Sequence, residues 1–160
     1  MTDELQEAFR AAMAGLAGGV CVVTTTDDED EPRGFAATSV TSLSLHPPLL
    51  AVSQSRGSSS HDVFRDCAHF GVSVLAREQR ELADRFATSG ADRFTGTGFR
   101  HGRHGCPLHP EALAEVECAR RDTVDAGDHV LLIGEVCAVR TRAGDPLVYQ
   151  DRRYHRLAPA

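Results

Sequence analysis

The first stretch of the chain carries large apolar side chains at the spacing of an amphipathic helix. They recur at intervals of four, four and three residues, which places them on one helix face: Leu5, Phe9, Met13 and Leu16. Thr2 is suited to cap the start of this helix, and Gly18 and Gly19 are suited to end it. We therefore expect a helix to open the chain.

Most of the remaining chain has the patterns of short strands. Runs of β-branched or alternating residues predict strands at 20–26, 38–43, 49–53, 70–75, 114–118 and 130–139, and a closing pair at 146–149 and 154–157. Two short helices are predicted at 60–66 and 78–86, the second with Leu82 and Phe86 on its apolar face. Residues 87–110 show no period and predict a long loop. Many short strands with few helices predict a mainly β fold, an antiparallel barrel rather than a βαβ fold.

Composition narrows the class of protein. The length of 160 residues fits a single domain over residues 1–160, and 41 % hydrophobic with 25 % charged residues is typical of a globular chain. The net charge of −6 argues against nucleic-acid binding. The apolar runs are too short for a membrane span, and the start of the chain does not resemble a signal peptide. Five cysteines without a CxxC pair predict neither a disulfide framework nor a zinc ribbon, so we expect a cytoplasmic protein.

The basic residues limit the possible chemistry. All 17 of them are arginine, and the chain has no lysine. Lysine is required for Schiff-base catalysis and for a P-loop phosphate site, so both are excluded. Any phosphate would have to be held by arginine, hydroxyl groups or backbone amides.

Two hydroxyl-rich segments are candidate ligand sites. The segment 34–44 carries Thr38, Ser39, Thr41, Ser42 and Ser44. These hydroxyls either populate an exposed strand face or line a polar, planar ligand. The segment 53–60, with sequence SQSRGSSS, is either a solvated serine-rich loop or an anion site. In the second case its hydroxyls, Arg56 and the free amides before a helix would bind a phosphate.

The histidines do not form a recognised ligand pattern. His129 opens an apolar strand, where a histidine is either structural or catalytic. His101, His104, Cys106 and His109 imitate a metal cluster, but no further cysteine or carboxylate completes a known spacing. We therefore expect no metal site. The chain also lacks the GxSxG motif of a hydrolase.

Five segments in order give the chain a family resemblance. They are FRAAMAGLAGGVCVVTT, ATSVTSLSLHPPLLAVS, SGADRF, DAGDHVLLIGEV and PLVYQDRRYHRL, and they run from about residue 9 to residue 157. Together they resemble the flavin reductase-like family, the reductase components of two-component flavin monooxygenases. The resemblance implies an antiparallel split β-barrel of Greek-key type, related to the FMN-binding barrels. It also implies a homodimer that transfers a hydride from NADH or NADPH to FMN or FAD. The reduced flavin then diffuses to a separate monooxygenase.

The resemblance also assigns roles to particular residues. It implies that one group flanks the isoalloxazine ring: Thr38, Ser39, Val40, Thr41 and Ser42. A second group would hold the flavin phosphate: Ser53, Ser55, Ser58 and Ser59. Arg93 and Phe94 would lie near the flavin tail. Three residues would meet the nicotinamide: His129, Arg153 and Tyr154, with His129 as an orienting or proton-handling catalytic residue. Arg152 stands where relatives usually have glycine, which adds a side chain beside the expected nicotinamide contacts.

Two other functions remain open at this level. One is a non-catalytic module that binds flavin or haem in the same barrel. The other is a reductase that retains its flavin and acts on an organic substrate. We expect FMN and NADH, with FAD and NADPH as alternatives, and neither nucleic acid nor membrane as a partner.

Overall fold

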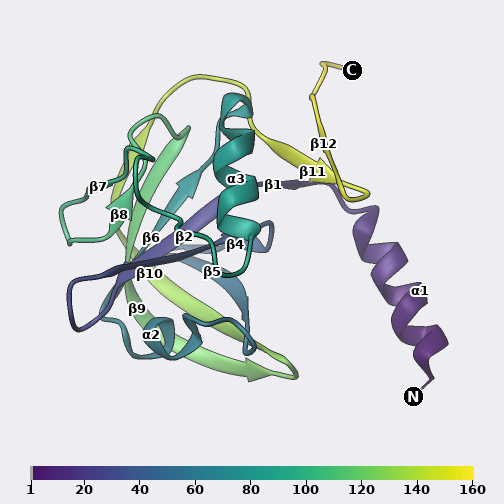
Figure 1. The fold of residues 1–160 in the computed structure, drawn as a ribbon, viewed down its shortest axis with the longest axis horizontal. Coiled ribbons are helices and arrows are strands. Elements are labelled where there is room, and N and C mark those ends of the chain that lie inside the picture. Colours follow the sequence, from purple (N-terminus) through teal and green to yellow (C-terminus); the bar gives the residue numbers. More distant parts are fainter. Residues whose placement is uncertain (1) are drawn as a thin grey trace.

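A seven-stranded antiparallel sheet forms the centre of the computed structural model, which describes residues 2–160 (Figure 1). Its strands follow the order β3-β2-β6-β9-β10-β5-β4. Their bounds are β2 Cys21–Thr26, β3 Pro32–Ala37, β4 Val40–Leu45, β5 Pro48–Ser55, β6 His69–Val74, β9 Ala114–Ala126 and β10 His129–Thr141. The prediction of a mainly β, antiparallel fold with few helices is therefore confirmed.

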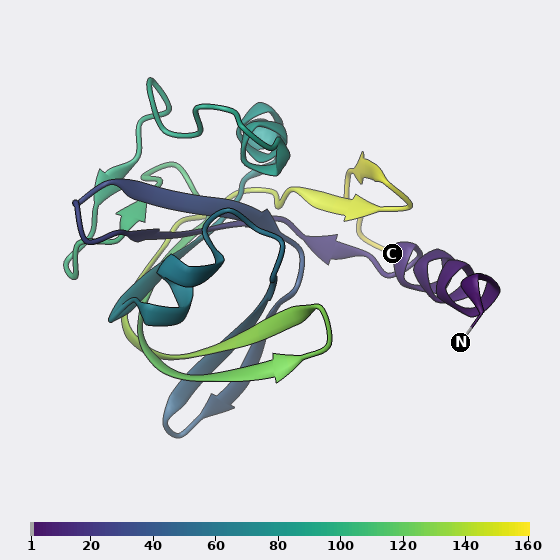
Figure 2. The same cartoon turned by 60° about the horizontal axis from the view of Figure 1, so that its bottom comes forward.

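The sheet curls around one apolar core. Val23 of β2 and Val52 of β5 lie in the same cluster of buried residues as Phe70 and Leu132, although β2 and β5 are four positions apart in the sheet. Only a strongly curved sheet brings these strands onto a common core, and the ribbon shows this curvature (Figure 2). β3 and β4 are the edge strands at opposite ends of this order, and Thr38 and Ser39 join them in the chain.

Three helical segments follow β5 in the chain. They are α2 His61–Asp66, the short 3₁₀ helix η1 Arg77–Gln79, and α3 Arg80–Ala87. Alternation along β2 directs Val22 to the opposite face from Val23, where it packs with Leu75 and with Phe86 of α3. The predicted helices at 60–66 and 78–86 are thus confirmed, and the apolar face of the second covers this smaller core.

The predicted opening helix is present as α1 Asp3–Ala14, but it packs differently from the other helices. It extends away from the sheet, and all of its residues are exposed except the half-buried Ala14 (Figure 1). Thr2 precedes it in an extended conformation, and its side chain makes no capping hydrogen bond within residues 2–160. Gly18–Gly19 forms β1, which pairs with β11.

The C-terminal strands form a small separate sheet. β11 Val148–Gln150 and β12 Arg153–His155 make a hairpin that pairs with β1, as the predicted closing pair requires. This hairpin also reaches α1, because Asp151 N donates to Ala14 O at 2.7 Å and Gln150 Nε2 donates to Gly15 O at 2.8 Å. The end of α1 is therefore tied to the β11–β12 turn.

The predicted loop at 87–110 is largely irregular. It contains only two very short strands, β7 Arg100–His101 and β8 Pro107–Leu108, which pair with each other. Part of the loop is buried, because Phe94 and Phe99 pack against Phe86 with ring centroids 5.0 and 5.3 Å away. These aromatic contacts hold the loop against α3.

Candidate functional site

A cavity of about 900 Å³ opens where the chain passes from β3 to β4, beside the end of β5. We call it the main cavity. It collects most of the residues that the two hydroxyl-rich segments and the family resemblance single out: Thr38, Ser39, Ser53, Ser55, Ser58, Ser59, Arg93 and His129. Residues far apart in the sequence therefore share one cavity.

The two hydroxyl-rich segments meet directly in this cavity. Ser39 Oγ donates to Ser53 O at 3.1 Å, and Ser53 N donates to Ser39 Oγ at 3.3 Å. The contact fixes the link between β3 and β4 against β5.

The serine turn after β5 is already rich in internal hydrogen bonds. Ser58 Oγ lies 3.1 Å from Ser60 Oγ, and Gly57 N donates to Ser55 Oγ at 3.2 Å. The amides of Ser58, Ser60 and His61 donate to oxygens of the same turn. The expectation of free amides before α2 is therefore wrong at these positions. The side chains of Ser55 and Ser59 are exposed to the cavity and are the groups of this turn open to a ligand.

Arg93 brings a positive charge to the other side of the main cavity. Its Nη1 donates to Gly34 O at 2.6 Å and its Nη2 donates to Thr88 O at 3.1 Å. Its Nε is buried and makes no hydrogen bond within residues 2–160. A buried donor without a partner costs free energy, and a bound anion would supply the missing acceptor.

His129 lies at the mouth of the main cavity, at the start of β10. Its Nδ1 is 2.8 Å from Asp128 Oδ1. The same contact lowers the pKa of the Asp128 carboxyl. Because a carboxylate only accepts hydrogen bonds, Nδ1 carries the proton and Nε2 of neutral His129 is the acceptor. The pair therefore fixes the orientation of the imidazole.

A second cavity of about 690 Å³ lies between α3 and the β11–β12 hairpin. We call it the hairpin cavity. It is lined by Arg152, Arg153 and Tyr154 of the hairpin and by Arg80 and Asp84 of α3. The two cavities share four wall residues: Ala36, Ala37, Thr38 and Ala87. They are therefore adjoining parts of one groove.

Tyr154 connects the two walls of the hairpin cavity. Its hydroxyl donates to Asp84 Oδ1 at 2.6 Å, and the Arg80 guanidinium carbon lies 4.9 Å from its ring centroid. Burial, followed by the hydrogen bond to Asp84, raises the pKa of Tyr154. The hydroxyl therefore stays protonated and remains a donor at neutral pH.

Four of the predicted site residues lie outside both cavities. Val40 packs against the main core, whereas Thr41 and Ser42 are exposed on β4. Phe94 packs among Phe86 and Phe99 and lines a neighbouring surface pocket instead. The structure thus brings Thr38 and Ser39 to the main cavity and leaves Val40, Thr41 and Ser42 on the edge strand β4.

Comparison with known proteins decides the family. A family model for the flavin reductase like domain matches residues 13–158. The chain belongs to this family. The match covers both cavities and the whole seven-stranded sheet.

The flavin reductase-like chain has similar relatives in several bacteria. It is 42 % identical to the NADH:riboflavin 5'-phosphate oxidoreductase of Streptomyces pristinaespiralis, over 96 % of this chain and 89 % of the relative. It is also 42 % identical to the actinorhodin polyketide dimerase of Streptomyces coelicolor, over 97 % of this chain and 88 % of the relative. Among solved structures, it resembles the NADH:FAD oxidoreductase SgcE6 of Streptomyces globisporus in complex with NAD and FAD fragments. There the TM-score is 0.90 and the identity 33 %, over 98 % of this chain and 94 % of the neighbour.

Sequence reasoning missed several residues of this flavin reductase-like groove. Gln54 lines the main cavity, and its Oε1 is buried without a hydrogen bond within residues 2–160. A lone glutamine in the apolar run of β5 was the available signal. Arg80 and Asp84 of the hairpin cavity have helical i, i+4 spacing, but only the fold shows that this face meets Tyr154.

The histidine-rich loop does not assemble as its spacing suggests. His109 is buried, with Nδ1 at 2.9 Å from Gln79 Nε2 and Nε2 at 2.8 Å from Thr97 O. Cys106 is also buried, and burial raises the pKa of its thiol. Both have structural roles, so the cluster of His101, His104, Cys106 and His109 is not a ligand set.

Among residues 2–160, each helix is too short or too polar to cross a membrane.

Proposed function

We propose that this flavin reductase-like protein transfers a hydride from NADH to FMN and releases the reduced flavin to a separate monooxygenase. The observation that carries the proposal is the shared wall of the two cavities. Ala36, Ala37 and Thr38 border both, so two planar ligands bound in them would meet over small side chains. Hydride transfer needs this close approach, at about 3–3.5 Å between the reacting atoms, more than it needs acid–base groups.

The main cavity suits the flavin. Two of its buried polar atoms have no partner within residues 2–160, the donor Arg93 Nε and the acceptor Gln54 Oε1. A ligand with an anionic phosphate and a polar ring edge would satisfy both. We assign the phosphate to Arg93 with the exposed hydroxyls of Ser55 and Ser59, flanked by those of Ser53 and Ser58. We assign the ring to Thr38 and Ser39. Bound flavin would supply the ring that accepts the hydride.

The hairpin cavity suits the nicotinamide cofactor. Arg80, Arg152 and Arg153 give it a positive side, which favours a dinucleotide phosphate. Tyr154 offers a flat ring and is held by Asp84. His129 lines the main cavity, and its Nδ1 is hydrogen-bonded to Asp128, which leaves Nε2 available to a ligand. We assign His129 to orienting the nicotinamide or handling a proton.

The phosphate site is built for modest affinity. Neutral serine hydroxyls bind phosphate less strongly than several charged groups would, and Arg93 is the one arginine that lines the main cavity among the residues described. A modest affinity suits an enzyme that releases its reduced flavin. The names of the relatives support this role, because similar proteins include the reductase component of a trigonelline monooxygenase from Acinetobacter baylyi.

We further propose that the enzyme is a cytoplasmic homodimer with a split-barrel fold. Support for the split barrel comes from the curved antiparallel sheet and its edge strands. Support for the dimer comes from α1 and from Leu16, two residues beyond its end. Leu5, Phe9, Met13 and Leu16 are between 49 and 71 % exposed along one stripe, which is unusual for a monomer.

A single assay tests the function. The purified protein should be pale, and NADH oxidation should accelerate when free FMN is added. The same assay with FMN or FAD, each combined with NADH or NADPH, would establish the preferred flavin and nicotinamide cofactor. A yellow protein whose NADH oxidation gains nothing from free flavin would contradict the release of flavin. Absence of NADH oxidation with either flavin would instead indicate a binding module.

A second function is favoured by one comparison. The polyketide dimerase of Streptomyces coelicolor is as similar to this chain as the riboflavin 5'-phosphate oxidoreductase of Streptomyces pristinaespiralis. The same groove would then retain its flavin and act on an organic substrate. Retention of flavin through gel filtration, with no stimulation by added flavin, would favour this function over the reductase.

A further inference from the structure

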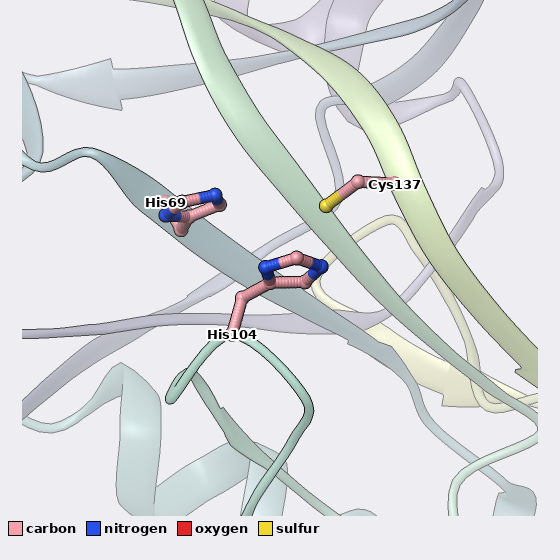
Figure 3. Close-up of side chains that lie close together, drawn as sticks. All are labelled: His69, His104 and Cys137. Atoms are coloured by element: carbon pink, nitrogen blue, oxygen red, sulfur yellow. The ribbon is translucent and has the colours of Figure 1, made fainter.

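Three potential metal ligands converge on the side of the sheet that carries the β7–β8 loop. His69 begins β6, His104 lies in the β7–β8 loop, and Cys137 lies on β10. Their side chains point toward one another (Figure 3), and one ligand atom of each lies within 4.8 Å of the others. The imidazoles of His69 and His104 are stacked, with centroids 4.8 Å apart and ring planes 13° apart.

A β-bulge directs Cys137 toward the two histidines. Val136 pairs with Cys118 and Ala138 pairs with Glu117, so Cys137 is the extra residue between them. A bulge changes the direction of a side chain relative to the regular alternation of a strand. The thiol consequently lies on the same side as His104 and is exposed.

The backbone beneath the other two ligands is firmly held. His69 O accepts a hydrogen bond of 2.8 Å from Thr25 Oγ1. His104 N donates to the buried carboxylate of Glu117 at 2.9 Å. The loop lies so close to this carboxylate that a Cβ on Gly102 would approach it to 2.6 Å. The backbone of His69 and of His104 is therefore held in place, while the His104 side chain is exposed.

The charges near the cluster favour a cation. Glu117 of β9 is 2 % exposed and is linked to all three elements of the site. Its side chain accepts a hydrogen bond from His104 N, and its backbone O accepts one of 3.2 Å from the Cys137 thiol. Glu117 also pairs with Gly71 of the neighbouring strand β6. Desolvation and the charge of Glu117 raise the pKa of Cys137, so the free thiol is protonated at neutral pH and would release its proton to water on binding a metal ion. Neutral imidazole is the form of histidine that binds metals.

We propose that His69, His104 and Cys137 bind one divalent transition-metal ion of the zinc class, with the fourth position open to water. In a tetrahedral zinc site, bonds of about 2.0–2.3 Å place neighbouring ligand atoms about 3.3–3.6 Å apart. The three ligand atoms lie within 4.8 Å of one another, which exceeds this spacing by at most about 1.5 Å. We expect rotation of the exposed His104 and Cys137 side chains to close that difference. Imidazole and thiolate together select zinc-like ions over magnesium or calcium.

The proposed ion lies far from the groove that the main cavity and the hairpin cavity form. Cys137 and His129 are on the same strand and eight residues apart, which corresponds to about 26 Å in an extended strand. The ion would join the β7–β8 loop to β6 and β10. It would not contact flavin or nicotinamide, so the proposal does not depend on the proposed reaction.

Cobalt(II) titration of the untagged full chain tests the site, because cobalt takes the place of zinc and reports thiolate ligation by a near-ultraviolet charge-transfer band. We expect one cobalt per chain with this band. Cys137→Ser should abolish the band, and His104→Ala and His69→Ala should weaken binding by about tenfold or more. His101→Ala, which removes an exposed histidine of β7 in the same loop region, is the matched control and should bind cobalt as the natural chain does. Cys137 and His104 are exposed, so their variants keep the test valid if His69→Ala does not fold.

Protection of the thiol gives an independent measurement. Added zinc should slow the alkylation of Cys137 by iodoacetamide, and the flavin reduction rate should stay unchanged. The proposal is overturned if cobalt binds the natural chain without a thiolate band, or if His101→Ala weakens binding as much as His104→Ala does.

Discussion

The Tyr154 hydroxyl donates a hydrogen bond of 2.6 Å to the Asp84 carboxylate, which joins the β11–β12 hairpin to α3 across the hairpin cavity. Tyr154→Phe removes this bond and leaves the ring in place beside Arg80. A hydrogen bond to a charged group contributes about 1.5–3 kcal/mol at most, so the hairpin should pack less firmly against α3 once the bond is lost. We expect the KM for NADH to rise several-fold while the KM for FMN changes little. Steady-state kinetics with each substrate varied in turn measures this, and an equal rise in both KM values would contradict the assignment.

Arg93 should discriminate flavins by their phosphate. Arg93→Ala removes the buried Nε that has no partner within residues 2–160. A hydrogen bond to a charged group contributes about 1.5–3 kcal/mol, so the KM for FMN should rise by about 10- to 100-fold. The KM for riboflavin, which has no phosphate, should stay nearly constant. Arg33→Ala is the control, because Arg33 pairs with Asp27 on the neighbouring surface. Equal effects on riboflavin and FMN would show that Arg93 only supports the fold.

His129 should affect nicotinamide binding more than turnover. His129→Ala removes the imidazole whose Nδ1 lies 2.8 Å from Asp128 Oδ1. Since hydride transfer itself needs no obligatory base, we expect the KM for NADH to rise more than kcat falls. Asp128→Asn should show a weaker form of the same effect, because the imidazole remains but is less well oriented. Complete loss of kcat in His129→Ala would make this residue essential for chemistry and contradict the orienting role.

Arg152 occupies a backbone conformation that favours glycine. Its φ is 62°, in the left-handed region, where a side chain costs about 1 kcal/mol relative to glycine. Arg152→Gly should therefore raise Tm by about 2–4 °C for each kcal/mol gained. It should also lower the KM for NADH, because a side chain leaves the hairpin cavity. Asp30→Gly is the matched control. Asp30 has a φ of 61° in a turn far from that cavity, so it should change Tm alone, as differential scanning calorimetry and kinetics together would show.

The apolar stripe of α1 should control self-association. Phe9 is 63 % exposed in the single chain, so Phe9→Asp should leave the fold of one chain intact. We expect the natural protein to sediment as a dimer and Phe9→Asp to sediment as a monomer with unchanged circular dichroism. Glu7→Gln, on the polar face of the same helix, should remain dimeric. A natural protein that sediments as a monomer at micromolar concentration would contradict the proposal.

Local patterns predicted the elements well. The β-branched run at 20–26 became β2, and the apolar face of 78–86 became the buried face of α3. These predictions succeeded because alternation and helical spacing directly express which side of an element is buried. The hydroxyls of Thr38, Ser39 and the serine turn also reached the main cavity together.

Contacts between distant residues were not predictable in this way. Tyr154 meets Asp84 because the hairpin closes over α3, and no spacing connects residues 70 positions apart. Cys137 meets His104 because one extra residue enters β10 and shifts its register. The prediction of free amides before α2 was wrong for a different reason. In a turn of small polar residues, the backbone amides donate to oxygens of the same turn, and the sequence does not show these hydrogen bonds.

If the proposed dimer forms through α1, the hydrogen bonds from Asp151 and Gln150 to the end of this helix would make protein concentration a variable of the kinetics. If α1 is ordered by pairing with a second chain, the same pairing steadies the turn that carries Arg152. Binding of NADH and association of chains then stabilise each other by thermodynamic linkage. Dilution below the dimer dissociation constant should raise the KM for NADH, and saturating NADH should tighten the dimer. α1, which lines neither cavity, would therefore set how well the enzyme works at low protein concentration.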